Sequence, residues 1–220
     1  MTKDRRPRRR SAMEGRLVAL GARLVERDGW WQPEAYTAAD EEVGAVRAGV
    51  GLFDLSPLSK LDVRALDPAA VWPKVFPGEE VPAANEIRPV ALAGRAALAV
   101  RLNPERFFLT APPGAGPEME AALREAAAAA AGAGGAGGAC VGVTDVTSGF
   151  ASVEVAGPAA AAVLRKLCPA VPPGEDRRAV QGPVAGVLAV ICRVDGAPGE
   201  GGGGAALPAY RRHVSRERGR

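Results

Sequence analysis

The sequence contains few aromatic residues, three cysteines and a single histidine. Aromatic residues make up 5% of the 220 positions against an apolar fraction of 47%, so we expect a core packed mainly with small side chains. His213 lies in the C-terminal segment, which excludes a histidine metal cluster and predicts that the core holds no Ser-His or Cys-His nucleophile pair. Cys140, Cys168 and Cys192 lack Cys-x-x-Cys spacing and lie in apolar settings, which predicts buried, reduced thiols without a disulfide framework or a zinc site.

Long apolar runs are also missing. No run approaches the roughly 20 residues that a membrane-spanning helix needs. The apolar stretch from Leu17 to Leu20 is flanked by Arg16 and Arg23 and is too short for the apolar region of a signal peptide. We therefore expect a soluble cytoplasmic protein that has no membrane partner.

The net charge of +3 is unevenly distributed along the chain. Residues 1–10 carry +5 and residues 211–220 carry +4, which leaves −6 for the residues between them. The basic segments could attract nucleic acid or an acidic partner surface, and the alternative is that they are solvated tails. Because no aromatic side chain interleaves with these arginines, no ring is available to stack on nucleic-acid bases, and we do not expect nucleic-acid binding.

Hydrophobic periodicity and turn residues predict alternating helices and strands. Asp67 followed by Pro68 is typical of a helix start, and residues 103–105 (Asn-Pro-Glu) are typical of a turn between two strands. This order predicts an α+β fold, in which mixed sheets carry flanking helices and residues 77–90 form an irregular connection. The predicted helices cover residues 11–27, 38–48, 68–75, 118–131 and 158–168. The predicted strands cover residues 60–64, 96–102, 106–111, 141–146, 151–156 and 184–194.

Two glycine-rich segments, residues 132–137 and 201–204, contain no convincing nucleotide-binding motif. The first satisfies the letters of a dinucleotide fingerprint, but it follows an alanine-rich helix and no helix opens directly after it to hold a phosphate. Neither segment has the Gly-Lys-Ser/Thr of a phosphate-binding loop. We therefore predict no nucleotide site in either segment.

Two longer blocks are more informative. Residues 48–63 combine a helix that stops at Gly49, a Leu-Phe corner and an alternating strand, and residues 143–158 form strands that lead into a Gly-Pro helix start. With these blocks the chain resembles the folate-binding domain of the glycine-cleavage T-protein (aminomethyltransferase). Residues 81–85, 102–109 and 166–169 are similar to the gamma subunit of heterotetrameric sarcosine oxidase, so the middle and C-terminal parts are closest to that subunit.

The resemblance covers residues 21–195 and implies a T-protein-like folate-binding domain that lacks the C-terminal barrel domain. Residues 1–20 are then a basic tail with the start of the first helix, and residues 196–220 are a glycine-rich segment followed by a basic tail. The resemblance also implies tetrahydrofolate as the cofactor, no metal, and a larger oxidase or folate-enzyme subunit as partner. The positions that line the family's folate channel correspond to Leu58, Val100 and Thr110, with Glu200 as the nearby carboxylate.

The chain departs from the T-protein where that family places its acidic residues. Arg95 and Ala96 stand at the positions of two adjacent aspartates, and residues 196–204 retain Gly199-Glu200 but not the family's aromatic residues or its final glutamate. Neither Arg95 nor Ala96 can accept a proton or orient an amine as a carboxylate does. We therefore predict no catalytic residue and a non-catalytic subunit or folate-binding module of one-carbon (glycine, sarcosine, tetrahydrofolate) metabolism. The alternative is a tetrahydrofolate-dependent aminomethyltransferase with altered active-site residues.

Overall fold

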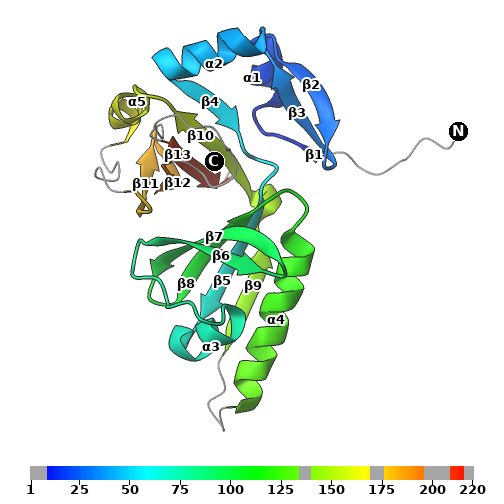
Figure 1. Ribbon diagram of the computed structural model, residues 1–220, viewed down its shortest axis with the longest axis vertical. Coiled ribbons are helices and arrows are strands. Elements are labelled where there is room, and N and C mark those ends of the chain that lie inside the picture. Colours follow the sequence, from blue (N-terminus) through cyan, green and yellow to red (C-terminus); the bar gives the residue numbers. More distant parts are fainter. Residues whose placement is uncertain (1–8, 134–139, 169–175, 196–208, 216–220) are drawn as a thin grey trace, which may run out of the picture.

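A computed structural model describes residues 9–133, 140–168, 176–195 and 209–215 of the chain (Figure 1). Within these residues the chain forms three sheets and five α-helices. We call the sheets the N-terminal sheet (order β1-β3-β2), the β5 sheet (order β6-β7-β8-β5-β9) and the β10 sheet (order β11-β12-β13-β10-β4). The neighbouring strands of the two five-stranded sheets pair antiparallel, and β1 pairs parallel with β3. The predicted α+β class with flanking helices is confirmed.

The N-terminal part differs from its prediction. The single helix expected over residues 11–27 is wrong, because the structure has the short helix α1 (Glu14–Ala19) followed by a hairpin of β2 (Arg23–Arg27) and β3 (Trp30–Ala35). Gly21 ends the helix at φ 88°, and Asp28-Gly29 turns the hairpin with φ 53° and 74°. Asp-Gly adopts such left-handed turns readily, and it outweighs the helical spacing of the leucines. The remaining strand of this sheet is β1 (Arg9–Arg10).

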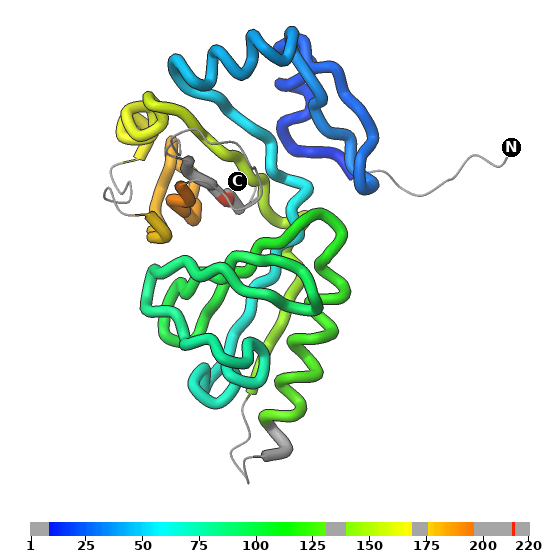
Figure 2. Tube along the Cα trace, viewed as in Figure 1, coloured from blue at the N-terminus to red at the C-terminus, as the bar shows by residue number. Residues whose placement is uncertain are grey.

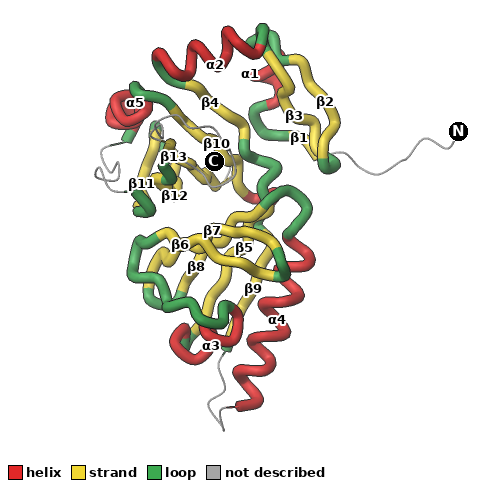
Figure 3. The backbone as a smooth tube through the Cα atoms, viewed as in Figure 1, coloured by secondary structure: helices red, strands yellow, loops and turns green. Residues whose placement is uncertain are grey.

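The β5 sheet carries helices α3 (Pro68–Val75) and α4 (Gly116–Ala133) against one face (Figure 3). Successive strand residues point to opposite faces, so Leu61, Val63, Phe107 and Leu109 lie on the helix side and are buried there. The helix start predicted at Asp67 is confirmed, since its carboxylate accepts a hydrogen bond from the Ala70 N–H at 3.1 Å. The strands are β5 (Ser59–Ala65), β6 (Ile87–Leu92), β7 (Arg95–Asn103), β8 (Arg106–Ala111) and β9 (Val141–Asp145).

The β10 sheet carries helix α5 (Ala160–Leu167) on one face. Strand β4, which follows helix α2 (Ala39–Ala48) in the chain, forms one edge of the sheet. Gly157 allows the end of β10 to pack closely against the end of α2, because a Cβ at position 157, where φ is 125°, would lie 2.5 Å from the carbonyl oxygen of Gly49. The five strands are β4 (Gly51–Asp54), β10 (Phe150–Ala156), β11 (Ala179–Val184), β12 (Val187–Arg193) and β13 (Ala209–Ser215), with a 3-10 turn (Thr147–Gly149) before β10.

Strand β13 is the main correction to the sequence-based prediction. Residues 209–215 lie inside the segment expected to be a tail, yet they pair with β10 on one side and β12 on the other, in the middle of the β10 sheet. The strand predicted over 184–194 is likewise two strands, because Ala185 and Gly186 form a turn with φ 49° and 80°. Strand β6 also occupies residues 87–90, which were expected to be irregular. The glycine-rich segments lie largely or wholly outside the described residues, and the domain boundaries stay predictions.

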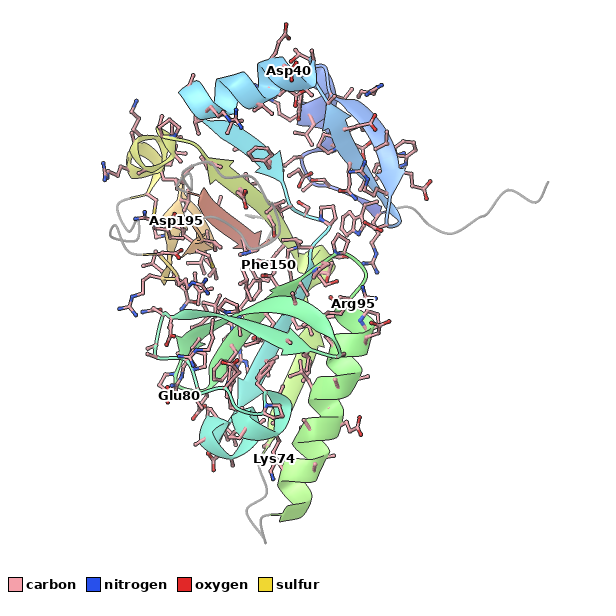
Figure 4. All side chains as sticks on the ribbon, viewed as in Figure 1. Asp40, Lys74, Glu80, Arg95, Phe150 and Asp195 are labelled. Carbon is pink, nitrogen blue, oxygen red and sulfur yellow. The ribbon has the colours of Figure 1, made fainter. Side chains whose placement is uncertain are left out.

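The two five-stranded sheets pack on each other through the faces that their helices leave free. Phe150 lies at this junction (Figure 4), where its ring centroid is 5.3 Å from that of Phe108. Cys192 is buried in the same cluster and Cys168 is buried under α5, but Cys140 is exposed, so the expectation that all three thiols are buried is wrong. The buried residues of this junction are Ile87, Val100, Leu102, Phe108, Ala179, Val190, Cys192 and Val194.

Candidate functional site

The candidate site lies on the face of the β5 sheet that is turned toward the β10 sheet. Strand alternation places Leu98 and Val100 of β7, Phe108 and Thr110 of β8, and Lys60 of β5 on this face. Thr110 is paired with Leu98 on one side and with Lys60 on the other, so the three residues form one row across the sheet. The face therefore combines an apolar wall with a hydroxyl group and a lysine.

Lys60 is the least expected residue of this face, because its side chain is 0% exposed. Its ammonium group donates to the carbonyl oxygens of Ser56 and Leu58, both at 2.8 Å, and its backbone N–H donates to the Thr147 hydroxyl at 3.0 Å. A buried cation is costly unless hydrogen bonds replace its water. The bend between β4 and β5 supplies these acceptors, and Lys60 in turn holds the bend in place.

A chain of buried hydroxyl groups connects this bend to the β10 sheet and ends at His213. The backbone N–H of Ser152 donates to the Ser56 hydroxyl at 3.2 Å, and the hydroxyl groups of Ser11 and Ser56 are 3.4 Å apart. The Ser152 hydroxyl lies 2.8 Å from His213 Nδ1, and the imidazole centroid is 5.0 Å from the ring centroid of Phe108. The expectation that His213 lies in a C-terminal tail is therefore wrong, because β13 carries it into the sheet.

The Ser152–His213 pair has the hydrogen-bond distance of a nucleophile and its base, but both residues are buried. A substrate cannot reach a serine that is covered in this way, so the pair connects β10 to β13 and does not form an exposed nucleophilic centre. Residues 209–215 do not alternate regularly between polar and apolar, so the sequence carries no clear strand signal that could have located the histidine in a sheet.

The carboxylate of this face is already engaged. On the described strands of the β5 sheet, Asp62 is the only acidic residue on this side, and the Arg106 guanidinium binds it with Nη2 at 2.7 Å and Nε at 2.9 Å. The hydrogen bonds and charge of Asp62 raise the pKa of Arg106 above its ordinary value, although burial acts in the opposite direction. A carboxylate held by two charge-assisted bonds is poorly placed to accept a proton.

The structure brings three of the four predicted contact residues to this region. Thr110 lies in the row with Lys60, and the Leu58 carbonyl accepts a hydrogen bond from the Lys60 ammonium group. Val100 is only 2% exposed and packs in the cluster between the sheets, so its side chain supports the wall and offers little surface to a ligand. Glu200 lies outside the described residues. Contact of these residues with a folate stays a prediction.

Position 96 lies on the same face as Leu98 and Val100, whereas position 95 points to the helix side. Ala96 is exposed and brings no polar group, and Arg95 forms an ion pair with Glu118 of α4 at 3.5 Å. Figure 4 shows Arg95 close to α4. A carboxylate at position 96 would face the β10 sheet, and this chain has a methyl group there.

An open depression of about 250 Å³, including solvent at its mouth, begins next to Leu98. Two carboxylates from outside the β5 sheet border it. Asp195 is bound by Arg193 at 2.6 Å, and Asp176 accepts a hydrogen bond from the Asp195 N–H at 2.8 Å. Apolar walls with a few polar groups have the character of a small-molecule site, but the volume is below the roughly 300 Å³ at which such sites begin, so the depression can take only part of a reduced folate. The lining residues are Ile87, Pro89, Leu98, Asp176, Arg177, Val194 and Asp195.

Among the described residues, no group of three or more histidine, cysteine, aspartate or glutamate side chains could hold a metal ion. None of the described helices is long and apolar enough to cross a membrane.

Comparison with curated proteins points to aminomethyltransferases. The aminomethyltransferase of Bordetella parapertussis is 34% identical over 99 residues, which cover 45% of this chain and 25% of that protein. The aminomethyltransferase of Thermotoga neapolitana is 44% identical over 55 residues, which cover 25% of this chain and 15% of that protein. The chain thus matches about a quarter or less of the length of these relatives.

Solved structures share the fold. The glycine cleavage system aminomethyltransferase T of Bartonella henselae superposes with a TM-score of 0.71 at 21% identity, over 94% of this chain and 54% of that chain. A chain of the heterotetrameric sarcosine oxidase from Corynebacterium sp. U-96 superposes with a TM-score of 0.54 at 25% identity, over 80% of this chain and 82% of that chain. The profile of the GCVT N-terminal domain family matches residues 13–195, and the chain therefore belongs to that family.

Proposed function

We propose that this protein is a non-catalytic subunit or folate-binding module of one-carbon metabolism that docks onto a larger oxidase or folate enzyme. The observation that carries the proposal is the state of the acidic groups on the candidate face: Asp62 is bound by Arg106, and Ala96 has no polar group. A protein that handles a proton and an amine needs a carboxylate poised to do so. The chain superposes on most of the length of one chain of a heterotetrameric sarcosine oxidase, and this match supports a subunit role.

Tetrahydrofolate is the proposed ligand of the depression beside Leu98. Leu98 and Pro89 would pack against its rings, and Thr110 and Leu58 are proposed contacts deeper in the row beside Lys60. The three free cysteines and the absence of a disulfide support a cytoplasmic location.

Calorimetric titration with tetrahydrofolate tests the binding part of this proposal. We expect measurable heat and a rise in melting temperature, since a ligand that binds only the folded state stabilises it. If millimolar tetrahydrofolate gives neither heat nor a thermal shift, folate binding is contradicted. Co-expression with a flavin-containing sarcosine oxidase subunit tests the docking part, and an isolated monomer without flavin contradicts it.

A second candidate function is a tetrahydrofolate-dependent aminomethyltransferase with altered residues. Asp176 favours it, because its carboxylate borders the depression that begins at Leu98, whereas Arg193 already binds Asp195. A fixed-time assay of aminomethyl transfer to tetrahydrofolate distinguishes the two candidate functions. Turnover that disappears in an Asp176→Asn variant supports the second candidate, whereas folate binding without turnover supports the first.

A further inference from the structure

Exposed apolar side chains are concentrated in the N-terminal part of the molecule. Seven of the eleven large apolar residues that are exposed in the described part lie between residues 18 and 53. Helix α2 contributes to this, because none of its residues is buried. Figure 2 shows the segment from α1 to α2 at the opposite end of the molecule from α3. The seven residues are Val18, Leu20, Tyr36, Val43, Val50, Leu52 and Phe53.

Three apolar residues of this part lie together and form a surface that we call the α2–β4 face: Val43, Val46 and Phe53. Val43 and Val46 are three residues apart on α2 and so lie on the same side of the helix. A Cβ placed at Gly51 would lie 2.5 Å from Val46 Cγ2 and 3.0 Å from Phe53 Cε2, so both side chains meet above β4. Val43 is 47% exposed and Phe53 is 42% exposed, so a large part of each side chain is open to solvent.

The turn before α2 places Tyr36 next to the start of that helix. Glu42 accepts hydrogen bonds from the backbone N–H groups of Tyr36 at 2.7 Å and Thr37 at 2.9 Å, which fixes the tyrosine beside the first turn of the helix. Burial and the negative charges of Asp54 and Glu42 raise the pKa of the Tyr36 phenol. The phenol therefore lies in a negative electrostatic potential at the edge of an apolar surface.

Acidic residues border this surface. Asp40 and Glu41 are exposed in the first turn of α2, where Figure 4 shows Asp40 at the outer end of the helix. With Glu42 and the single base Arg47, the helix carries a net charge of −2. Two copies that packed α2 against α2 would bring −4 together across an apolar contact, and an anionic lipid surface would also be repelled.

We propose that the α2–β4 face binds an amphipathic segment of a partner protein whose apolar stripe is flanked by lysine or arginine. An apolar patch bordered by charge that is negative on balance is typical of a surface that recognises a partner of opposite charge. This inference rests on the proposed function in one respect, since it names the surface through which the larger subunit docks. It does not depend on folate binding.

Binding of two labelled model peptides to the full chain, followed by fluorescence anisotropy at physiological salt, tests the inference. Both peptides have leucine at helical spacing, and their polar positions are all lysine in one and all glutamate in the other. We expect the lysine peptide to bind at least about tenfold more tightly than the glutamate peptide. Val43→Asp and Phe53→Asp should each weaken the lysine peptide by about tenfold, and a combined Asp40→Lys and Glu41→Lys change should reverse the preference.

Matched variants elsewhere on the surface control for a general charge effect. Leu188 is 67% exposed on β12, so Leu188→Asp adds the same charge at another apolar site, and Glu79→Lys with Glu80→Lys matches the charge reversal. These controls should leave binding unchanged, and melting curves should show that every variant is folded. Equal binding of both peptides, an equal effect of Leu188→Asp, or a dimer in sedimentation that Phe53→Asp dissociates would each overturn the inference. If the peptide result holds while the folate titration and the flavoprotein co-expression fail, the proposed function fails and this surface stands.

Discussion

The β5 sheet and the N-terminal part of the chain differ in how completely they are covered. The β5 sheet is covered on both faces, by α3 and α4 on one side and by the β10 sheet on the other. The N-terminal part from α1 to β4 buries Leu17 and Trp30, but α2 has no buried residue and seven of the eleven large apolar residues that are exposed in the described part lie between residues 18 and 53. The β5 sheet therefore buries more apolar side chains than the N-terminal part, which keeps apolar surface exposed.

The difference indicates different demands on the two regions. Buried apolar area stabilises a fold in proportion to the water that it excludes, and the β5 sheet has the larger share. Apolar surface that stays exposed adds little to the stability of the isolated chain and is typical of interaction sites. Variants that remove equivalent side chains from the two regions can therefore measure how far this comparison holds.

Matched phenylalanine truncations should give the largest contrast. Phe108 is buried at the junction of the two sheets, where it contacts Phe150 and His213, whereas Phe53 is on the α2–β4 face. We expect Phe108→Ala to lower the free energy of unfolding by about 3–5 kcal/mol, because it removes a buried ring and leaves a cavity. Phe53→Ala should cost about 1 kcal/mol or less. Urea denaturation of both variants measures the contrast, and similar losses would refute it.

Matched lysine replacements should give a smaller effect. Lys60→Met leaves the Ser56 and Leu58 carbonyls without the ammonium donor in a buried setting, so we expect a loss of about 1–3 kcal/mol. Lys74→Met changes an exposed lysine of α3 and should alter stability by about 0.5 kcal/mol at most. Thermal and urea unfolding compare the two variants. A stabilised Lys60→Met would mean that desolvation of the ammonium group outweighs its hydrogen bonds.

Local signals allowed several elements to be predicted from the sequence. Asp67-Pro68 starts α3 because a carboxylate cap and a proline at the first position act within one turn of helix. The hairpin of β7 and β8 follows in the same way from the turn at Asn103, which accepts a hydrogen bond from the Glu105 N–H. The resemblance to the T-protein also gave the correct family, because its two blocks are continuous in the sequence.

Features that depend on distant segments could not be predicted. Strand β13 follows a glycine-rich segment and is rich in arginine, so its composition suggests a tail, and only its pairing with β10 and β12 makes it a central strand. The buried network of Ser152 and His213 depends on that pairing, since the two residues are 61 positions apart. Lys60 was part of an alternating strand, but its burial depends on the bend that supplies two carbonyl acceptors.

The helix caps provide a finer comparison of the two regions. Asp67 caps α3, which packs in the core of the β5 sheet. We expect Asp67→Ala to lower the free energy of unfolding by about 1 kcal/mol, because the Ala70 N–H loses its acceptor. Asp67→Asn should retain most of the stability, since an amide oxygen can still accept this bond. An Asn variant as unstable as the Ala variant, measured by urea denaturation, would contradict the capping role.

Glu42 should contribute least, because its two hydrogen bonds hold an exposed turn in the less covered region. Bonds from the Thr37 and Tyr36 N–H groups lower the pKa of its carboxyl below the ordinary value of 4.5. A carboxylate whose pKa is lowered by folding stabilises the folded state above its unfolded pKa, and this contribution is lost as the pH falls through the folded pKa. Glu42→Gln should therefore reduce stability at pH values above 4.5, by less than Asp67→Ala, and the difference from the parent chain should shrink in more acidic solution. Glu41→Gln changes the same charge in the same turn without removing the two hydrogen bonds of Glu42. An equal, pH-dependent loss in that variant would assign the effect to helix charge instead of to these bonds.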